Sequence, residues 1–335
     1  MSSSLQLMDL IQSHRVTSVI YLAAKLGIPD LLLDGAKPLP QLAAETAAHE
    51  GALARLLTAL QTVGICSKDE LELWTLTDMG RTLAQNTVGS VRDWAIFEGE
   101  MLARSWSGMM ESIMTGKTAA ELRGVASSFD MMANAPEQVT LFNAAMASLT
   151  AIVTQGLLEA YDFSDVTHLV DVGGGSGELI GAVLSRYPHL QGTVFDLPRC
   201  ALQATEHLAK LGLGKRAHFV AGNFFDLVPS IGDAMILKSV VHDWDEQRSL
   251  AILENCCRAL PPNGRLLLVE RVMPLRPAVC AEHRAHAMSD LNMLRGPGGK
   301  ERTEQEYRHL LERSGFTVKS VRPAGRFSVI EAKHA

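Results

Sequence analysis

A short apolar strand that ends in an acidic residue and enters a loop of glycines is the most informative part of this 335-residue chain. The run LVDVGGGSGE, residues 169–178, places Gly173, Gly175 and Gly177 at alternate positions. Glycines let the backbone turn sharply and approach a ligand closely. A dinucleotide-binding fingerprint needs its last glycine at the sixth position of the pattern, which here is Glu178. The loop therefore predicts a nucleoside ligand without phosphates, of which S-adenosylmethionine is the common example.

A second acidic residue follows the glycine loop at the distance expected for a nucleoside site. The segment 191–198 reads as a strand in which Asp196 lies near the end. An acidic side chain about 20 residues beyond such a loop typically binds the ribose hydroxyls. A glycine triplet alone would also fit an ordinary tight turn, but the combination of strand, loop, helix and acidic residue favours the nucleoside.

His242 has the residue type and the position of a general base. It lies in the run VVHDW, residues 240–244, just after a predicted strand. The unperturbed pKa of histidine lies near neutral pH, which suits proton abstraction. A lone histidine is more often structural, but Glu270 closes the next strand and brings a carboxylate to the same sheet edge. Such a carboxylate fixes the imidazole tautomer and stabilises the imidazolium. Glu301 is a candidate for a second one, which spacing alone does not place.

The elements that must position these residues alternate between strand and helix from residue 167 onward. Such alternation predicts an α/β fold with a doubly wound, mostly parallel sheet, in which ligands bind at the carboxyl ends of the strands. Residues 315–318 and 327–330 are expected to form a terminal strand pair at the edge. The candidate polar residues all fall at or just beyond predicted strand ends, and they are Asp171, Asp196, Asn223, Lys238, His242 and Glu270.

Residues 1–97 show a helical pattern followed by two short apolar segments, which together predict a winged-helix-like domain. DNA binding is disfavoured, because the expected recognition helix offers only Arg55 as a cation and the formal net charge is -6. A helix over residues 7–26 is apolar over more of its surface than one packing face requires, which favours a homodimer. We expect a dimerisation domain at 1–97, a helical linker to the substrate pocket at 98–160 and a catalytic domain at 161–335.

The composition narrows the class of protein further. Hydrophobic residues make up 47% of the chain, enough for a full core. No basic region precedes an apolar stretch at the start, and no apolar run approaches the length of a bilayer span. The five cysteines show no metal-ligand spacing. These features predict a cytoplasmic protein with reduced thiols and without a metal, a nucleic-acid partner or a membrane partner.

Four motifs of the chain resemble those of one enzyme family. They are DVGGGSG at 171–177, FDLP at 195–198, HDW at 242–244 and PGGKERT at 297–303. They are similar to motifs of the caffeic-acid/hydroxyindole type of S-adenosylmethionine-dependent O-methyltransferase, which includes bacterial enzymes that methylate natural-product phenols. The resemblance covers nearly the whole chain. It implies an intertwined homodimer and metal-free methyl transfer from S-adenosylmethionine to a hydroxyl of an aromatic or heteroaromatic small molecule.

The same resemblance implies a role for each site residue. The implied base is His242, flanked by Glu270 and Glu301. The residues implied to bind the cofactor are Gly173 and Gly175 in the loop, Asp196 at the ribose, Asn223 and Phe224 at the adenine, and Lys238 near the amino-acid end. The family usually has aspartate at the position of Asn223, whose oxygen accepts a hydrogen bond without the help of a charge. The residues implied to bind the acceptor are Phe142, Met146, Asp243 and Asn292.

Two other functions stay open. A family member can bind the cofactor and catalyse hydroxylation, decarboxylation or a pericyclic step, but such members often lack the histidine–carboxylate pair that this sequence retains. A winged-helix regulator that senses a metabolite is disfavoured by the acidic charge balance and the sparse cations. The identity of the acceptor depends on the shape of the pocket, which one sequence does not give.

Overall fold

The computed structural model describes residues 2–133 and 135–335, except for the side chains of 129, 132 and 133, and the chain divides into two compact units. Unit 1 comprises Met1–Arg104 and Ala135–Leu149, and unit 2 comprises Ser105–Asn134 and Thr150–Ala335. The long helix α12 (Pro136–Ala160) belongs to both units. The unit boundaries differ from residues 97 and 160, so the three-part division stays a prediction.

Unit 1 packs short helices around a small antiparallel sheet of order β1-β3-β2. Its elements other than α12 are α1 (Ser3–Gln12), α2 (His14–Lys25), α3 (Ile28–Leu33), β1 (Lys37–Pro38), α4 (Leu39–Thr46), α5 (Glu50–Thr62), β2 (Cys66–Lys68), β3 (Leu73–Leu76), α6 (Asp78–Arg81), α7 (Arg92–Phe97) and η1 (Glu98–Leu102). Its core gathers side chains such as Leu32, Leu57 and Trp74 from α3, α5 and β3. The helix expected over residues 7–26 is divided at Ser13, whose hydroxyl donates to the carbonyl of Leu10 at 2.7 Å.

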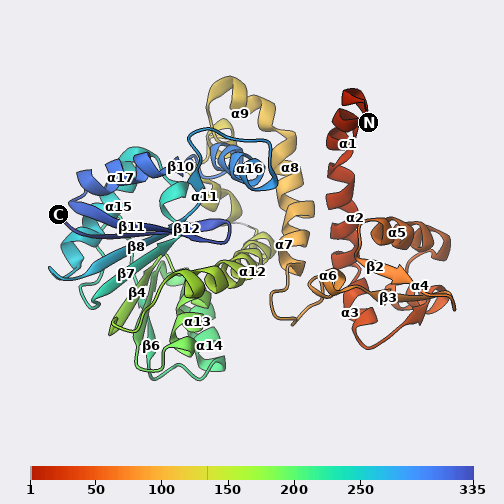
Figure 1. Cartoon of the computed structure of the whole chain (residues 1–335), viewed down its shortest axis with the longest axis horizontal. Helices are drawn as coiled ribbons and strands as arrows, with labels where there is room; N and C mark the ends of the chain where they lie inside the picture. The colour runs from red at the N-terminus through yellow and green to blue at the C-terminus, as the bar shows by residue number, and fades with distance from the viewer. Residues whose placement is uncertain (1, 134) are drawn as a thin grey trace. The chain divides into compact units, whose positions relative to one another are not determined.

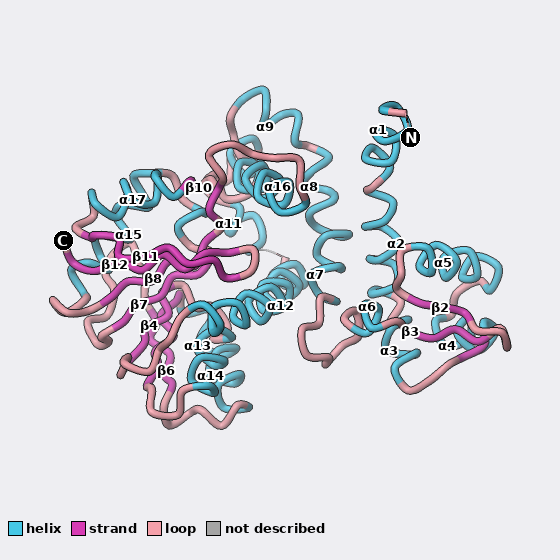
Figure 2. Tube along the Cα trace, viewed as in Figure 1, coloured by secondary structure: helices cyan, strands magenta, loops and turns pink. Residues whose placement is uncertain are grey.

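Unit 2 is the α/β part of the chain, in which strands and helices alternate (Figures 1 and 2). Helix α8 (Ala103–Ser107) crosses the boundary between the units. The elements that follow, apart from α12, are α9 (Met109–Thr115), α10 (Ala119–Leu122), α11 (Ser128–Ala133), β4 (His168–Val172), α13 (Glu178–Arg186), β5 (Gln191–Asp196), η2 (Pro198–Cys200), α14 (Ala201–Lys210), β6 (Ala217–Ala221), β7 (Ala234–Lys238), η3 (Val241–Asp243), α15 (Glu246–Ala259), β8 (Arg265–Glu270), β9 (Val272–Met273), α16 (Ala281–Arg295), β10 (Arg302–Thr303), α17 (Glu304–Arg313), β11 (Phe316–Ala324) and β12 (Phe327–His334).

The central sheet has seven strands in the order β11-β12-β8-β7-β4-β5-β6. Strands β4 to β8 pair in parallel, whereas β12 pairs antiparallel with β8 and β11 antiparallel with β12. This order confirms the predicted doubly wound, mostly parallel sheet and its terminal strand pair. Because parallel strands end at one edge, the sheet brings the residues that follow β4, β5, β7 and β8 to the same side of unit 2.

Helices cover both faces of the sheet, which explains why its strands read as nearly continuous apolar runs. On one face, Val170 and Leu268 pack with Leu253 of α15 and Leu311 of α17. On the other face α13 approaches closely, since a Cβ on Gly192 would lie 2.8 Å from a side-chain carbon of Ile180. Figure 1 shows α15 and α17 on one side of the sheet and α13 and α14 on the other.

Helix α12 corrects one expectation from the sequence. It is long and apolar enough to cross a membrane, with a mean hydropathy of 1.5 over its most apolar window, 28% of which is buried. Residues 98–160 are helical as expected, but the expectation that no apolar run approaches the length of a bilayer span is wrong, because threonine, asparagine and glutamine residues interrupt the apolar run of this helix in the sequence. Length and composition are weak evidence for a span, since core helices of soluble proteins have the same properties, and Ala145, Val153 and Leu157 on α12 are buried in the fold.

Candidate active site

The glycine loop after β4 is shaped by left-handed backbone conformations. Gly173, Gly175 and Gly177 have φ values of 78°, 55° and 80°, which residues with side chains rarely adopt. Gly173 also permits close packing, because a Cβ there would lie 2.8 Å from Val240 Cγ2. A Cβ on Gly175 would meet no atom within 4 Å. The loop is therefore open at Gly175, where a ligand can approach the backbone.

Asp196 ends β5 and lies against the glycine loop. Its Oδ2 accepts a hydrogen bond of 2.8 Å from the N–H of Gly175, and its Oδ1 accepts one of 2.6 Å from the N–H of Leu197. A carboxylate has further lone pairs, which can accept hydrogen bonds from the two hydroxyls of a ribose. The structure thus brings the two halves of the predicted nucleoside site together.

Two charged groups, the buried Asp171 and the partly buried Lys238, lie at the carboxyl ends of β4 and β7. Asp171 in β4 is 2% exposed, and its Oδ2 has no hydrogen-bond partner within the described part of the chain. This oxygen would lie 2.7 Å from a Cβ on Gly174. Burial raises the pKa of Asp171 to about 7, opposed by the charge of Lys238. Burial also lowers the pKa of Lys238, opposed by Asp171 and by Glu270.

A buried carboxylate without a partner is costly unless a ligand satisfies it. Asp171 and Lys238 together fit a zwitterion, since one can bind an ammonium group and the other a carboxylate. The amino-acid end of S-adenosylmethionine is such a zwitterion. Sequence reasoning placed Asp171 at a strand end without giving it a role, and its burial was the missing signal.

Asn223 and Phe224 follow β6, as predicted. The side-chain oxygen of Asn223 accepts a hydrogen bond of 3.0 Å from the N–H of Phe225, so this oxygen already stabilises a local turn. Phe224 packs edge-on against Phe225 and Trp244, with ring centroids 4.9 Å and 6.1 Å away. One of its ring carbons would lie 3.7 Å from a Cβ on Gly173, so Phe224 borders the glycine loop. An apolar ring at this place suits stacking with a nucleobase.

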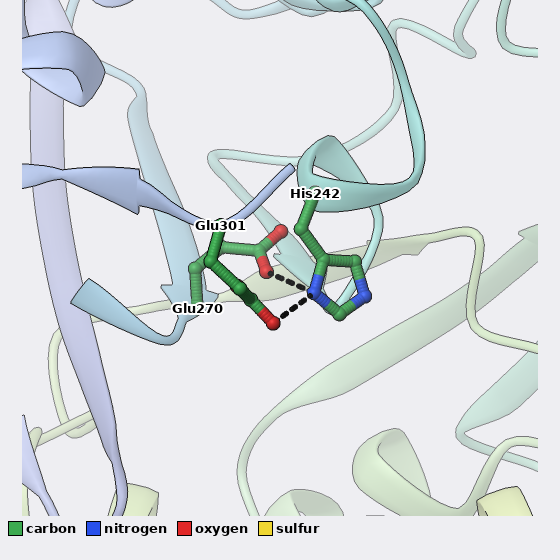
Figure 3. A group of neighbouring side chains, drawn as sticks. All are labelled: His242, Glu270 and Glu301. Atoms are coloured by element: carbon green, nitrogen blue, oxygen red, sulfur yellow. Dashed lines mark hydrogen bonds and ion pairs between the residues drawn. The ribbon is translucent and has the colours of Figure 1, made fainter. Parts of the chain in front are cut away.

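His242 lies on the 3-10 turn η3, which follows β7, and it is 6% exposed. Its Nδ1 lies 3.1 Å from Glu301 Oε1 and 3.6 Å from Glu270 Oε2. Figure 3 shows the two carboxylates converging on this one nitrogen. The other ring nitrogen, Nε2, lies 3.5 Å from Asp243 Oδ1. The structure therefore joins Glu301 to the predicted pair of His242 and Glu270.

Each glutamate is itself held in place. Glu270 Oε1 accepts hydrogen bonds of 3.0 Å and 2.8 Å from the backbone N–H groups of Val240 and Val241, which leaves its Oε2 to face the imidazole. Glu301 Oε1 also accepts a hydrogen bond of 2.7 Å from the hydroxyl of Ser289 on α16. Both carboxylates are buried. The ring of His242 is thus oriented by groups that cannot swing away into water.

The segment 299–302 is packed against the turn that carries His242. A Cβ on Gly299 would lie 2.0 Å from the carbonyl oxygen of His242, so only glycine fits there. Arg302 is 2% exposed, and its guanidinium donates to the carbonyls of Val241 and Trp244 at 2.9 Å and 2.8 Å. Sequence reasoning overlooked both residues, although they stand in the same GGKERT run as Glu301.

The carboxylates change the proton affinity of His242. Burial alone would lower the pKa of His242, but Glu270, Glu301 and Asp243 outweigh it and raise this pKa to about 9. Burial tends to raise the pKa of Glu301, but the charge of His242 and the hydrogen bonds to Glu301 hold it below its ordinary value. Burial raises the pKa of Glu270, and raises that of Asp243 to about 6.

The residues predicted to bind the acceptor fall in both units. Phe142 and Met146 lie on the part of α12 that belongs to unit 1, where the ring of Phe142 packs edge-on against Phe97 at 5.8 Å. Asn292 lies on α16 in unit 2, three residues after Ser289, and residues at this spacing share a helix face. Asn292 is therefore on the side of α16 that carries a hydrogen bond to Glu301. Acceptor binding by Phe142 and Met146 stays a prediction.

The His242 cluster also has the composition of a metal site. Ligand atoms of His242, Glu270 and Glu301 lie within 4.8 Å of one another. The hydrogen bond from the imidazole to Glu301 and its ion-pair contact with Glu270 account for this proximity without an ion. The expectation of a metal-free site stays a prediction.

Comparison with known proteins matches two family models to the chain. Residues 106–317 match an O-methyltransferase domain, and residues 8–86 match an O-methyltransferase dimerisation domain. The phenazine O-methyltransferase PhzM of Lysobacter antibioticus is 39% identical over 328 residues, which cover 98% of this chain and 95% of that protein.

Two further similarities bear on the chemistry. The solved structure of an O-methyltransferase (NcsB1) from neocarzinostatin biosynthesis, in complex with S-adenosylmethionine and 2-hydroxy-5-methyl naphthoic acid, has a TM-score of 0.74, 29% identity and 96% coverage of both chains. The aclacinomycin 10-hydroxylase RdmB of Streptomyces purpurascens is 32% identical over 319 residues, which cover 92% of this chain and 85% of that protein.

Proposed function

Because the chain belongs to the family of S-adenosylmethionine-dependent O-methyltransferases, we propose that it methylates a hydroxyl of an aromatic or heteroaromatic natural-product intermediate. His242 takes the hydroxyl proton in this reaction. The observation that carries the proposal is the pair of buried glutamates at Nδ1 of His242. Relatives that act on phenazine and naphthoate rings support an aromatic acceptor.

The residues that would hold S-adenosylmethionine are those around the glycine loop. Its ribose would meet Asp196, its adenine Asn223 and Phe224, and its amino-acid end Asp171 and Lys238. The open backbone at Gly175 and the unpartnered oxygen of Asp171 support this assignment. When bound, the cofactor supplies a methyl group that its sulfonium charge has already activated.

The glutamates determine which nitrogen of His242 is available to the acceptor. Nδ1 is occupied by Glu301 and Glu270, so its proton stays in place and Nε2 is left to receive the hydroxyl proton. The carboxylates stabilise the imidazolium that this transfer creates. Proton transfer to a positioned base contributes about 10²–10⁴-fold to the rate. Well-oriented reactants gain more, with effective molarities of about 10⁵–10⁸ M.

The proposal is tested by a screen for methyl transfer. The protein is incubated with methyl-labelled S-adenosylmethionine and a set of hydroxylated phenazines, naphthoates and quinones, each paired with its own O-methyl ether as a matched control. We expect label in a hydroxyl-bearing acceptor and none in its blocked control. Equal labelling of both members of every pair would place the methyl group elsewhere than on oxygen and would contradict the proposal.

Hydroxylation is the second candidate function, because a named hydroxylase is 32% identical to the chain. The histidine–carboxylate cluster favours methyl transfer, since a hydroxylation does not require a base at the acceptor oxygen. Mass analysis of the product in the same screen separates the two, because methylation adds one methylene unit and hydroxylation adds one oxygen.

The N-terminal region supports a homodimer in this proposal. Residues 8–86 match a dimerisation domain of the family. Helix α1 has no buried residue, and its exposed apolar side chains include Leu7, Leu10 and Ile11. An exposed apolar surface of this kind marks a contact with another protein surface. The winged-helix interpretation of the region stays a prediction.

A further inference from the structure

We propose that Asn255 of α15 is a positioning residue for the cofactor, because it holds the segment 223–225 that would bind the adenine ring. Asn255 is 4% exposed and lies inside a helix, not at one of the strand ends that form the site. The inference rests on the proposed function, since it concerns the same cofactor site. It adds a residue that acts through the backbone of Phe224 and Phe225.

Asn255 stands on the buried face of α15, which is otherwise mostly apolar. Ile252, Leu253 and Cys256 on this face belong to the hydrophobic core of unit 2. A buried amide lowers the stability of the fold unless its donors and its oxygen find hydrogen-bond partners. The partners of Asn255 therefore show what this side chain does in the structure.

Both N–H groups and the oxygen of the Asn255 amide have partners. Its Nδ2 donates to the backbone carbonyl of Phe224 at 2.7 Å and to that of Phe225 at 3.0 Å. Its Oδ1 accepts a hydrogen bond from the guanidinium of Arg258 on the same helix. The reverse orientation of the amide would place its oxygen against two carbonyl oxygens, so the donors must face the loop. Asn255 thus ties two consecutive peptide groups to α15.

The two carbonyls belong to the loop after β6, which borders the nucleoside site. The loop begins at Gly222, whose N–H donates to the carbonyl of Asp196 at 2.9 Å. In the described part of the chain, no donor other than Asn255 reaches the carbonyls of Phe224 and Phe225. The place of these two peptide groups therefore depends on Asn255.

The ring of Phe224 is held separately from its backbone. It packs edge-on against Phe225 and Trp244, with ring centroids 4.9 Å and 6.1 Å away. A second aromatic ring binds to it favourably only within a narrow range of distance and tilt. A shift of the backbone at residues 224 and 225 would move the ring out of this range. Asn255 therefore determines how well the adenine is bound.

A different residue of α15 holds the turn that carries His242. The hydroxyl of Ser249 lies 3.3 Å from the carbonyl oxygens of Val241 and Trp244, which stand on either side of His242. Helix α15 thus supports the adenine segment through Asn255 and the turn of the base through Ser249. Because the two supports are separate side chains, a change at Asn255 should act on cofactor affinity and leave the turn in place.

Asn255→Asp tests the inference, because it keeps the shape of the side chain and replaces both donors by an oxygen. We expect the dissociation constant of S-adenosylmethionine in calorimetry to rise at least about fivefold, and that of adenosine, which lacks the amino-acid end, to rise by the same factor. With the acceptor that the methyl-transfer screen finds, kcat at saturating cofactor should change less than about twofold. Glu254→Gln, an exposed change at the preceding residue, is the matched control. Wild-type affinity in folded Asn255→Asp, or a loss confined to kcat, would overturn the inference.

A double-mutant cycle with Phe224→Leu separates positioning from a merely structural role. If Asn255 acts through Phe224, the two substitutions together weaken adenosine binding little more than Phe224→Leu alone. Additive losses would overturn the inference. Wild-type affinity in Phe224→Leu would instead contradict the proposed place of the adenine, and with it the inference. Weaker binding in Phe224→Leu with wild-type binding in Asn255→Asp would overturn the inference alone.

Arg258→Met serves as the second variant if Asn255→Asp does not fold. Arg258 is exposed, and its loss frees the oxygen of the Asn255 amide while both donors remain. We expect adenosine binding to weaken about 2–5-fold, as for the loss of one hydrogen bond, and the loss to disappear in the Phe224→Leu background. Unchanged adenosine affinity in Arg258→Met would then overturn the inference.

Discussion

Replacement of Arg302 by lysine should damage the turn that carries His242 while sparing the cofactor site. The guanidinium of Arg302 donates three hydrogen bonds of 2.8–3.1 Å, to the carbonyls of Val241 and Trp244 and to the hydroxyl of Ser249. These groups lie before and after His242, so the side chain holds both ends of the turn. Lysine keeps the charge but cannot span two carbonyls with one nitrogen.

The expected magnitude follows from these contacts. A hydrogen bond with a charged partner contributes about 1.5–3 kcal/mol, so the loss of two of the three lowers the free energy of unfolding by about 3–6 kcal/mol. A displacement of His242 also lowers kcat, and about 1.4 kcal/mol of lost transition-state stabilisation is a tenfold change in rate. We expect kcat to fall at least tenfold in Arg302→Lys. The dissociation constant of S-adenosylmethionine should stay within about twofold, because Arg302 does not contact the glycine loop.

The assay combines denaturant unfolding, calorimetric cofactor binding and steady-state methyl transfer. Arg308→Lys is the matched control, because Arg308 lies on the surface of α17, paired with Glu304, and such a change alters stability by less than about 0.5 kcal/mol. Gly299→Ala tests the same contact from the other side, since its Cβ would lie 2.0 Å from the carbonyl oxygen of His242. Wild-type kcat in both Arg302→Lys and Gly299→Ala would mean that packing of the segment 299–302 against the turn does not position His242.

Three further predictions concern other parts of the molecule. Asp196→Ala should weaken S-adenosylmethionine binding at least tenfold, since hydrogen bonds to a charged group contribute about 1.5–3 kcal/mol each. An unchanged affinity in calorimetry would mean that Asp196 does not bind the ribose. The pKa of His242 is raised from 6.5 to about 9 in the folded protein. Protonation of His242 therefore stabilises the fold fully below pH 6.5, and this stabilisation is lost as the pH rises through about 9. Thermal unfolding of the wild type should therefore lose more stability between pH 7 and pH 10 than that of His242→Gln, and parallel losses would contradict the raised pKa of His242. Full-length protein should sediment as a dimer and Leu10→Glu with Ile11→Glu as a weaker one, whereas an active wild-type monomer at micromolar concentration would exclude the homodimer.

The sequence predicted the sheet and half of the site because both depend on local signals. The apolar residues of the strand before Gly173 and of the helix after it recur with different periods, and glycines separate the two elements. Asp196 follows the glycine loop at the distance expected for a nucleoside site. Parallel strands end at one edge, so the approach of Asp196 to the loop followed from topology alone. The meeting of Glu270 with His242 followed in the same way, since β7 and β8 are neighbours.

The rest of the site depends on contacts that no local pattern encodes. Glu301 is 59 residues from His242 in the sequence, and its place is determined by how the segment before β10 folds back onto η3. The same folding of the segment before β10 onto η3 brings Gly299 close to the carbonyl of His242 and lets the guanidinium of Arg302 reach the carbonyl of Val241. That Asp171 Oδ2 is buried without a hydrogen-bond partner depends on the three-dimensional fold, which the sequence pattern does not give. Phe142 and Met146 could be named from the family resemblance, but their part in acceptor binding depends on pocket shape.

The role of His242 as the base is tested by the single-turnover rate of methyl transfer in His242→Gln, measured with the enzyme saturated by S-adenosylmethionine. Glutamine keeps a polar side chain of similar size but cannot hold the acceptor proton or carry the charge. We expect a rate about 10²–10⁴-fold below that of the wild type, with an unchanged cofactor dissociation constant and the label on the acceptor oxygen. A rate within twofold of the wild type at neutral pH would contradict it.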